Sequence, residues 1–158
     1  MFAKIRAQLA RSRRTGKPIS VRYSAFGEIA SRLESELRPP LRVIRNPRQE
    51  QKLLDLRIAP DAVVYNEETS QMVLLEIESA PTYDDDDVPF GTVIKLLQLK
   101  DWNAMLNPRV VLVSLAPISP SFELALVEHD IGVIRGRTCD DVMPALLDFI
   151  HAGSVAHR

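Results

Sequence analysis

Two apolar segments decide the fold of this chain: Pro60-Asp61-Ala62-Val63-Val64-Tyr65 and Met72-Val73-Leu74-Leu75-Glu76-Ile77-Glu78. Both have the length of a strand, and the polar residues between them are typical of a hairpin connection, so the second strand should return alongside the first. Side chains alternate along a strand, which puts Glu76 and Glu78 on one face. Asp61 opens the first segment and should therefore meet Glu76 at one end of the hairpin.

These acids form a candidate site for a divalent metal ion. Mg²⁺ or Mn²⁺ binds fixed carboxylate oxygens and keeps positions open for water and phosphate. Asp61 and Glu76 would be the first ligands, and the backbone carbonyl of Ile77 would be a further one. Glu78 would complete the site or accept a proton from an attacking water. The alternative is a set of solvated strand acids, but an unpaired charge on such apolar strands is costly.

The rest of the chain alternates helical and strand patterns. Apolar residues at spacings of three and four indicate helices, and short apolar runs between turn residues indicate strands. The predicted order is helix, three strands, helix, strand, helix, strand and helix, over residues 25–37, 41–45, 52–65, 72–79, 91–107, 109–115, 119–129, 131–135 and 140–150. This order predicts a three-layer α/β domain with a mixed central sheet, in which the helix of Glu28 and the helix of Lys95 cover one face.

A length of 158 residues fits one domain with a substantial core. We expect this domain over residues 21–150, with a basic N-terminal arm over 1–20 and a flexible tail over 151–158. The arm is rich in Lys and Arg and has no acid, so it would contact phosphates, dock a partner or act as an organellar presequence. The four aspartates at 84–87 predict a solvated loop rather than a metal site.

Composition and charge narrow the class of protein. The single cysteine, Cys139, excludes an internal disulfide and a zinc site built from thiolates, and no apolar run approaches the roughly 20 residues that span a bilayer. These features favour a cytoplasmic protein. Residues 1–57 carry a net charge of +9 and residues 58–158 one of −10. This asymmetry indicates either a basic surface for a polyanion beside an acidic centre or mutual attraction between two halves of one fold.

Three helical residues are further candidates for chemistry. Glu28 lies in the first helix beside the apolar stripe, where it would serve the site or remain an exposed acid. Lys95 and Gln98, with Trp102, follow spacings of three and four and so share one helical face. The lysine would neutralise charge that develops on a phosphate, and the glutamine would orient water or a backbone phosphate, unless both belong to an ordinary polar face.

Taken in order, these elements resemble the PD-(D/E)XK, or restriction-endonuclease-like, nuclease superfamily. The resemblance covers roughly residues 24–136 and is carried by Glu28, Pro60-Asp61, Glu76-Ile77-Glu78 and Gln98. Residues 122–134 are similar to the closing helix and strand of Holliday-junction-resolvase and Mrr-type members. The segment Gln98-Leu99-Lys100-Asp101-Trp102 is similar to the Gln-x-x-x-Tyr motif of exonuclease relatives. The resemblance implies a three-layer α/β/α restriction-endonuclease-like core.

The chain departs from the family at Glu78, where most members have a lysine that polarises the attacking water or stabilises charge on the phosphate. Some restriction enzymes of the superfamily use Glu-x-Glu, and others carry the lysine on the following helix, where Lys95 stands in this chain. The resemblance therefore implies one of two things. Either the site is active, with two metals or a relocated lysine, or the nuclease fold has lost catalysis and only binds.

The activity that the resemblance implies is Mg²⁺- or Mn²⁺-dependent hydrolysis of phosphodiester bonds in DNA. Asp61, Glu76 and Glu78 would hold the metal. Lys95 or Gln98 would assist at the phosphate. Contacts to DNA phosphates would come from Arg11, Arg13, Arg14, Arg42, Arg45 and Arg48. Cutting both strands would need two copies, so a homodimer is expected. The alternative is a catalytically inactive module that binds DNA or a protein within a larger DNA-processing assembly.

Overall fold

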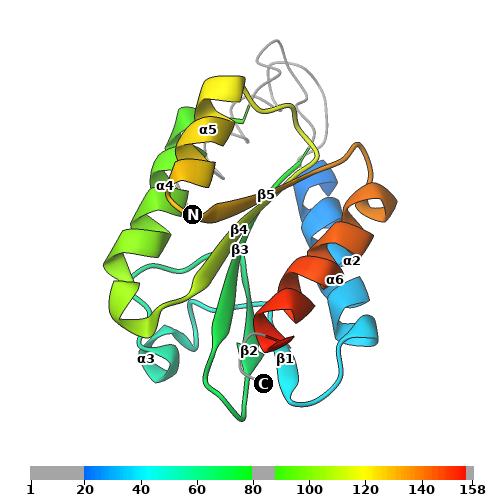
Figure 1. The fold of residues 1–158 in the computed structure, drawn as a ribbon. Helices are drawn as coiled ribbons and strands as arrows, with labels where there is room; N and C mark the ends of the chain where they lie inside the picture. Colours follow the sequence, from blue (N-terminus) through cyan, green and yellow to red (C-terminus); the bar gives the residue numbers. More distant parts are fainter. Residues whose placement is uncertain (1–19, 80–87, 156–158) are drawn as a thin grey trace.

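A computed structural model describes residues 20–79 and 88–155 of the chain (Figure 1). The elements are, in order, α2 (Ser20–Glu36), β1 (Leu41–Ile44), α3 (Gln51–Leu54), β2 (Ala62–Asn66), β3 (Met72–Glu78), α4 (Phe90–Trp102), the 3-10 helix η1 (Ala104–Leu106), β4 (Arg109–Ser114), α5 (Pro120–Glu128), β5 (Ile131–Arg135) and α6 (Cys139–Val155). The predicted order is confirmed, with α3 and η1 added. α6 ends at Val155, so residues 151–155, which were expected in the flexible tail, are helical. Arg11, Arg13 and Arg14 of the arm and the aspartates at 84–87 lie outside the described residues.

The five strands form one mixed sheet in the order β1-β2-β3-β4-β5. β1, β2 and β3 pair antiparallel, whereas β3, β4 and β5 pair parallel, because α4 and α5 carry the chain back across the sheet between them. β2 therefore runs opposite to the other four strands. The register sets Ala62 opposite Leu75, which brings Asp61, the residue before β2, to the level of Glu76.

Helices cover both faces of the sheet. α2 and α6 pack on one face, against Val73, Leu75 and Ile77 of β3, while α4 and α5 pack on the other, against Leu74 (Figure 1). Alternate side chains of β3 enter the two cores, so all seven of its residues are buried. Within the described residues, no helix combines the length and the apolar content that crossing a membrane demands.

The expectation that the helices of Glu28 and Lys95 cover one face is wrong. Glu28 lies on α2 and Lys95 on α4, and the sheet separates these two helices (Figure 1). α4 joins two neighbouring parallel strands, and the right-handed crossover rule fixes the face on which such a helix lies. No such rule applies to α2, which precedes an antiparallel strand. Its apolar stripe fits either face, so periodicity alone could not choose between them.

The strand predicted over residues 52–65 is wrong in its first half. Residues Gln51–Leu54 form α3, which ends at Asp55 in the left-handed conformation, with φ of 56°. The Gln51 side-chain amide donates to two backbone carbonyl oxygens just beyond this turn, at 2.9 and 3.0 Å. These bonds hold the chain in a compact turn, and β2 begins only at Ala62.

Leu74→Ala should destabilise the fold strongly. Leu74 is fully buried in the central strand, and such a truncation costs about 2–5 kcal/mol through lost burial and the cavity left behind. Leu53→Ala is the matched control because Leu53 is 87% exposed on α3, and its truncation should change the free energy of unfolding by less than about 0.5 kcal/mol. Urea denaturation followed by circular dichroism measures both values. Equal losses in the two variants would contradict this assignment of the core.

Candidate active site

Asp61 and Glu76 meet where β2 begins. The Asp61 N–H donates to Glu76 Oε1 at 3.1 Å and to the Leu75 carbonyl oxygen at 3.0 Å. In return, Asp61 Oδ2 accepts a hydrogen bond from the Ile77 N–H at 2.9 Å. The juxtaposition that the hairpin pattern predicts is therefore confirmed, and backbone bonds in both directions fix the two acids relative to each other.

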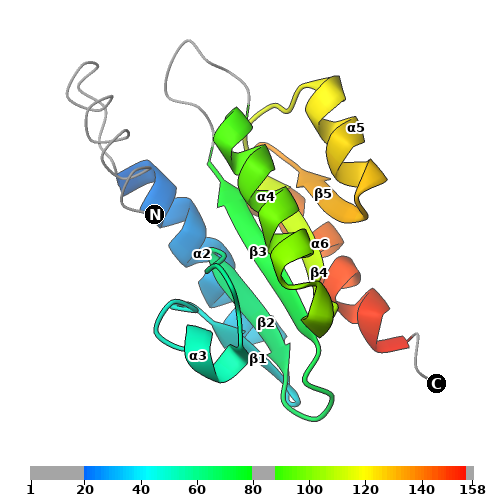
Figure 2. The same ribbon diagram turned by 90° about the vertical axis from the view of Figure 1, so that its left-hand side faces the viewer.

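α4 contributes two partners for the carboxylates of β3. Figure 2 shows this helix lying along β3 and β4. Lys95 Nζ lies 2.5 Å from Glu76 Oε1. One helical turn earlier, the Thr92 hydroxyl donates a short hydrogen bond to Glu78 Oε1. Because α4 runs antiparallel to β3, its successive turns reach Glu78 and then Glu76, and the two carboxylates are held from the same helix.

These contacts lie deep in the protein. The Glu76 side chain is 0% exposed and that of its partner Lys95 is 22% exposed, while Glu78 and Thr92 are both buried. A carboxylate removed from water is costly unless charge or hydrogen bonds compensate it. The arrangement therefore gives each buried acid a partner from α4 and leaves one partner, Lys95, with a path to solvent.

Thr92 is a residue that the sequence interpretation missed. It lies four residues before Leu96, on the buried stripe of α4. A hydroxyl on an apolar stripe needs a buried acceptor, because an unsatisfied polar group inside a core costs free energy. The helical spacing of Thr92 to Leu96 and Leu99 therefore carried a usable signal that a polar partner faces this helix from the sheet.

The types of donor at this site fit a hard divalent cation. Asp61, Glu76 and Glu78 offer carboxylate oxygens, as Mg²⁺ and Mn²⁺ prefer. In an extended strand, the N–H and C=O of one residue point to the same side, so the carbonyl of Ile77 points toward Asp61 as its N–H does. The positions of these side chains fit a metal ion less well than their chemical types do. In the described parts of the chain, no three His, Cys, Asp or Glu side chains are grouped so as to hold a metal. The cation in contact with Glu76 is the Lys95 ammonium.

The remaining predicted site residues lie in different surroundings. Gln98 is half-buried one turn after Lys95 on α4. Glu28 is exposed on α2 and pairs with Arg32 at 2.8 Å. Its other neighbour is Cys139 of α6, across the α2–α6 interface. The structure thus joins Lys95 to the acids of β2 and β3, whereas the contacts of Glu28 lie on the opposite side of the sheet.

Two of the described arginines of the predicted DNA surface, Arg42 and Arg45, pair with acids. Arg42 on β1 pairs with Glu67 at 2.9 Å and Glu50 at 3.5 Å. Arg45 pairs with Glu34 at 2.6 Å, and this hydrogen bond lowers the pKa of the carboxyl. Ile44 lies opposite Val63, so Arg45 follows β1 at the end of the sheet where Asp61 precedes β2. Arg48 is exposed in the segment after β1.

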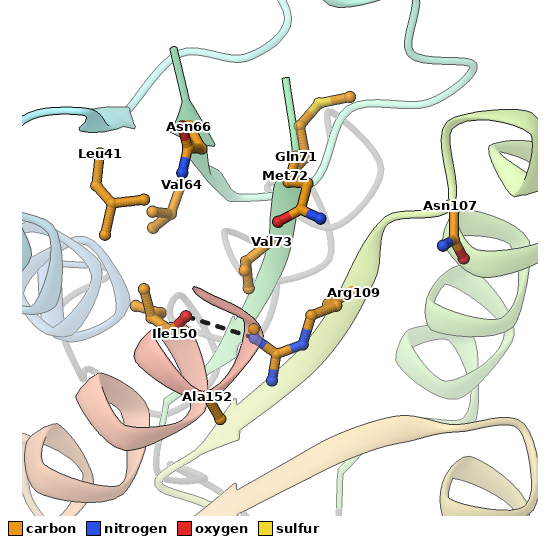
Figure 3. Close-up of a pocket in the computed structure, with 11 residues that line it drawn as sticks. Leu41, Val64, Asn66, Gln71, Met72, Val73, Asn107, Arg109, Ile150 and Ala152 are labelled. Carbon is orange, nitrogen blue, oxygen red and sulfur yellow. Dashed lines mark hydrogen bonds between the residues drawn. The ribbon is translucent and has the colours of Figure 1, made fainter. Parts of the chain in front are cut away.

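A separate cavity lies at the opposite end of the sheet. It has a volume of about 310 Å³ and is lined by the first residues of β3 and β4 and the last turns of α6 (Figure 3). Arg109 is its charged residue. Its guanidinium stacks on the Phe149 ring at 4.0 Å and donates to the Ile150 carbonyl oxygen at 3.5 Å, and burial lowers its pKa. These contacts account for Arg109 as a residue that fastens α6 to the sheet.

Comparisons with known proteins leave the interpretation to this geometry. No protein-family model matches the chain, and neither does any curated protein or solved structure. The function must therefore be argued from the contacts of Asp61, Glu76, Glu78, Thr92 and Lys95 themselves.

Thr92→Val should destabilise the protein by about 1–3 kcal/mol, because it keeps the shape of the side chain and removes a donor from a buried carboxylate. Thr69→Val is the control, since Thr69 is exposed in the β2–β3 turn and its loss should cost less than about 1 kcal/mol. Urea unfolding measures both variants. A Thr92→Val protein as stable as the wild type would show that the hydroxyl does not support Glu78.

Cys139 should react slowly with a maleimide while the protein is folded. Burial and, next, the Glu28 carboxylate raise the pKa of its thiol to about 11, from an ordinary value of 9.0. The thiolate is the reactive form, so at pH 8 a shift of this size should slow labelling about 100-fold relative to the unfolded chain. Glu28→Gln should speed it, because the neighbouring carboxylate would be neutral. Mass spectrometry at timed intervals measures the rate, and similar rates in native and urea-unfolded protein would contradict the assigned environment.

Proposed function

We propose that this protein is a metal-dependent DNA nuclease of the PD-(D/E)XK type, built on a three-layer restriction-endonuclease-like core. The observation that carries the proposal is the convergence of Asp61, Glu76 and Lys95 from β2, β3 and α4, within hydrogen-bond distance of one another through Glu76. An acid before one strand, a second acid on the next and a lysine on the following helix are the parts that a relocated-lysine site requires.

The architecture supports the proposal at a coarser level. The chain has a five-stranded mixed sheet with helices on both faces, and its elements follow the order from which the resemblance was drawn. Asp61 and Glu76 lie where β2 begins beside β3, at the level where the chain before β2 leaves the sheet. A fold can host many activities, so the site rather than the sheet carries the argument.

The chemistry at this site divides among a few residues. When bound, Mg²⁺ or Mn²⁺ would supply a Lewis acid and an acidified water. The carboxylates of Asp61, Glu76 and Glu78 would hold it, together with the carbonyl of Ile77. Asp61 is oriented for this role by the Ile77 N–H. Thr92, through its hydrogen bond to Glu78, would orient that carboxylate.

Lys95 and Gln98 would act at the phosphate. The Lys95 ammonium is the positive charge next to the acids, and it would stabilise the charge that develops on a phosphate oxygen in the transition state. Gln98 lies one turn farther along the same helix, where its amide would orient the nucleic-acid backbone. Glu28 has no part in this scheme, because its contacts are with Arg32 and Cys139.

DNA would be held by the exposed arginines. The pairs that Arg42 and Arg45 make with glutamates are on the surface, where an ion pair contributes only about 0–1 kcal/mol. A phosphate can therefore replace the carboxylate at little cost. Arg48 and the arginines of the N-terminal arm would add contacts that do not depend on sequence. Two copies of the chain would be needed to cut both strands.

A second function, a catalytically inactive module that binds DNA or a protein partner, has one observation in its favour. The carboxylates of Glu76 and Glu78 already have partners in Lys95 and Thr92, so these contacts do not depend on a metal. Acids that are held by contacts from a neighbouring helix can persist in a protein that no longer cleaves.

A cleavage assay separates the two functions. Purified protein is incubated with plasmid and with labelled linear or branched DNA in Mg²⁺, Mn²⁺ or EDTA. We expect metal-dependent cleavage that falls on the order of 100-fold or more in Asp61→Asn and in Glu76→Gln, because each loses a charged ligand. Glu68→Gln, an exposed acid in the turn at the far end of the same hairpin, should cleave like the wild type.

The contrary result is equally informative. Intact DNA in every lane with folded protein would exclude the nuclease for these substrates. Salt-dependent retention of DNA in a mobility-shift assay, weakened in Arg45→Gln, would then support the binding module.

A further inference from the structure

The contact between Lys95 and Glu76 places a cation on a carboxylate oxygen that the proposed metal site would use. Lys95 Nζ lies 2.5 Å from Glu76 Oε1, and this same oxygen accepts the N–H of Asp61, the next proposed ligand. Mg²⁺ binds carboxylate oxygens at 2.0–2.1 Å. An ammonium in close contact with that oxygen, on the side of the sheet where α4 lies, leaves little room for a second cation on it.

We propose that Lys95 is an internal competitor for the divalent cation. Its ammonium neutralises Glu76 in the metal-free protein and leaves Glu76 Oε1 when the metal binds. The inference rests on the proposed function, since it concerns the control of the same site. In this role, which precedes catalysis, Lys95 sets the metal concentration at which the site binds its cation.

Electrostatics favours exchange over joint occupancy. Glu76 is fully buried, so its charge is compensated by near neighbours rather than by water. Two like charges a few ångströms apart repel strongly at a buried site, and a divalent ion doubles the repulsion that a monovalent one would feel. The ammonium and the metal therefore oppose each other on one carboxylate, and the state with both on Glu76 is disfavoured.

Lys95 has a route by which to leave. Its side chain is 22% exposed, and its neighbour on the helix, Ile94, is also exposed. A lysine has a long flexible stem and a strongly hydrated charge, so rotation about its side-chain bonds carries the ammonium to water while the backbone of α4 stays in place. Thr92 differs, because its neutral hydroxyl can keep donating to Glu78 after a metal binds.

The first test is calorimetric titration of Mn²⁺ into three full-length proteins. Lys95→Met should raise the Mn²⁺ association constant on the order of tenfold or more, because the competing charge is gone. Lys100→Met is the matched control. Lys100 lies on the same helix, is 24% exposed and pairs with Asp130, so it carries an equal charge away from the acids and its loss should change the constant less than about twofold.

The second test uses the wild-type protein and separates displacement from a simple change in field. The protein is acylated briefly with an N-hydroxysuccinimide ester, with and without saturating Mn²⁺, and modified lysines are mapped by mass spectrometry. Displacement predicts that Mn²⁺ increases the labelling of Lys95 several-fold relative to Lys100, the internal reference. This readout needs no variant, so it decides the question even if Lys95→Met fails to fold.

The outcomes distinguish competition by Lys95 from the proposed metal-dependent function on which it rests. Mn²⁺ binding that Asp61→Asn abolishes, with unchanged Lys95 labelling, would overturn the competition and leave the metal site standing. Unchanged labelling would overturn it even if Lys95→Met bound Mn²⁺ more tightly, because a field effect alone would explain the gain. No Mn²⁺ binding by the wild type or by Lys95→Met would overturn both.

Discussion

The burial of two carboxylates on the central strand is the constraint on which the rest of this structure depends. β3 is covered on both faces, so the side chains of Glu76 and Glu78 enter the core beneath α4 rather than water. A buried charge left alone costs several kcal/mol. The compensation comes from the Asp61 N–H at the start of β2 and from Lys95 and Thr92 on α4. The start of β2 and the helix α4 are thus both tied to one strand by the need to satisfy its acids.

This constraint also explains how α4 is placed along the sheet. Apolar packing through Val93, Leu96 and Leu99 attaches the helix to its face but is tolerant of sliding, because hydrophobic contact is not directional. Hydrogen bonds and ion pairs are directional. Thr92 contacts Glu78, and Lys95, one helical turn later, contacts Glu76, two residues earlier on the strand. They act as two fixed points that set the helix position, and the same two points place polar groups at the candidate site.

The sequence predicts much of this and fails where long-range choices decide. The hairpin of β2 and β3 is local, so alternation and a polar turn were enough to bring Asp61 to Glu76. The end of α3 depends on Asp55 adopting a left-handed conformation and on the Gln51 amide folding back, which no apolar period reveals. The face of α2 depends on packing between distant segments, so the prediction that the helices of Glu28 and Lys95 share a face was wrong. The role of Thr92 could have been predicted from the sequence, because its helical spacing places a hydroxyl among buried leucines.

Glu78 in place of a lysine changes the charge balance of the proposed site rather than simply removing a catalytic group. Asp61, Glu76 and Glu78 bring three formal negative charges, and Lys95 returns one positive charge from the helix. With a lysine at 78 as well, the cluster would carry no formal net charge and would attract a divalent ion weakly. With Glu78 it keeps a deficit of two, which is the charge of the proposed cation. A lysine on α4 that is 22% exposed also has a path to water that a side chain at the buried position 78 lacks. The departure from the pattern that the sequence resembles therefore fits the proposed site, whose acids are held by α4 and whose net charge matches a divalent cation.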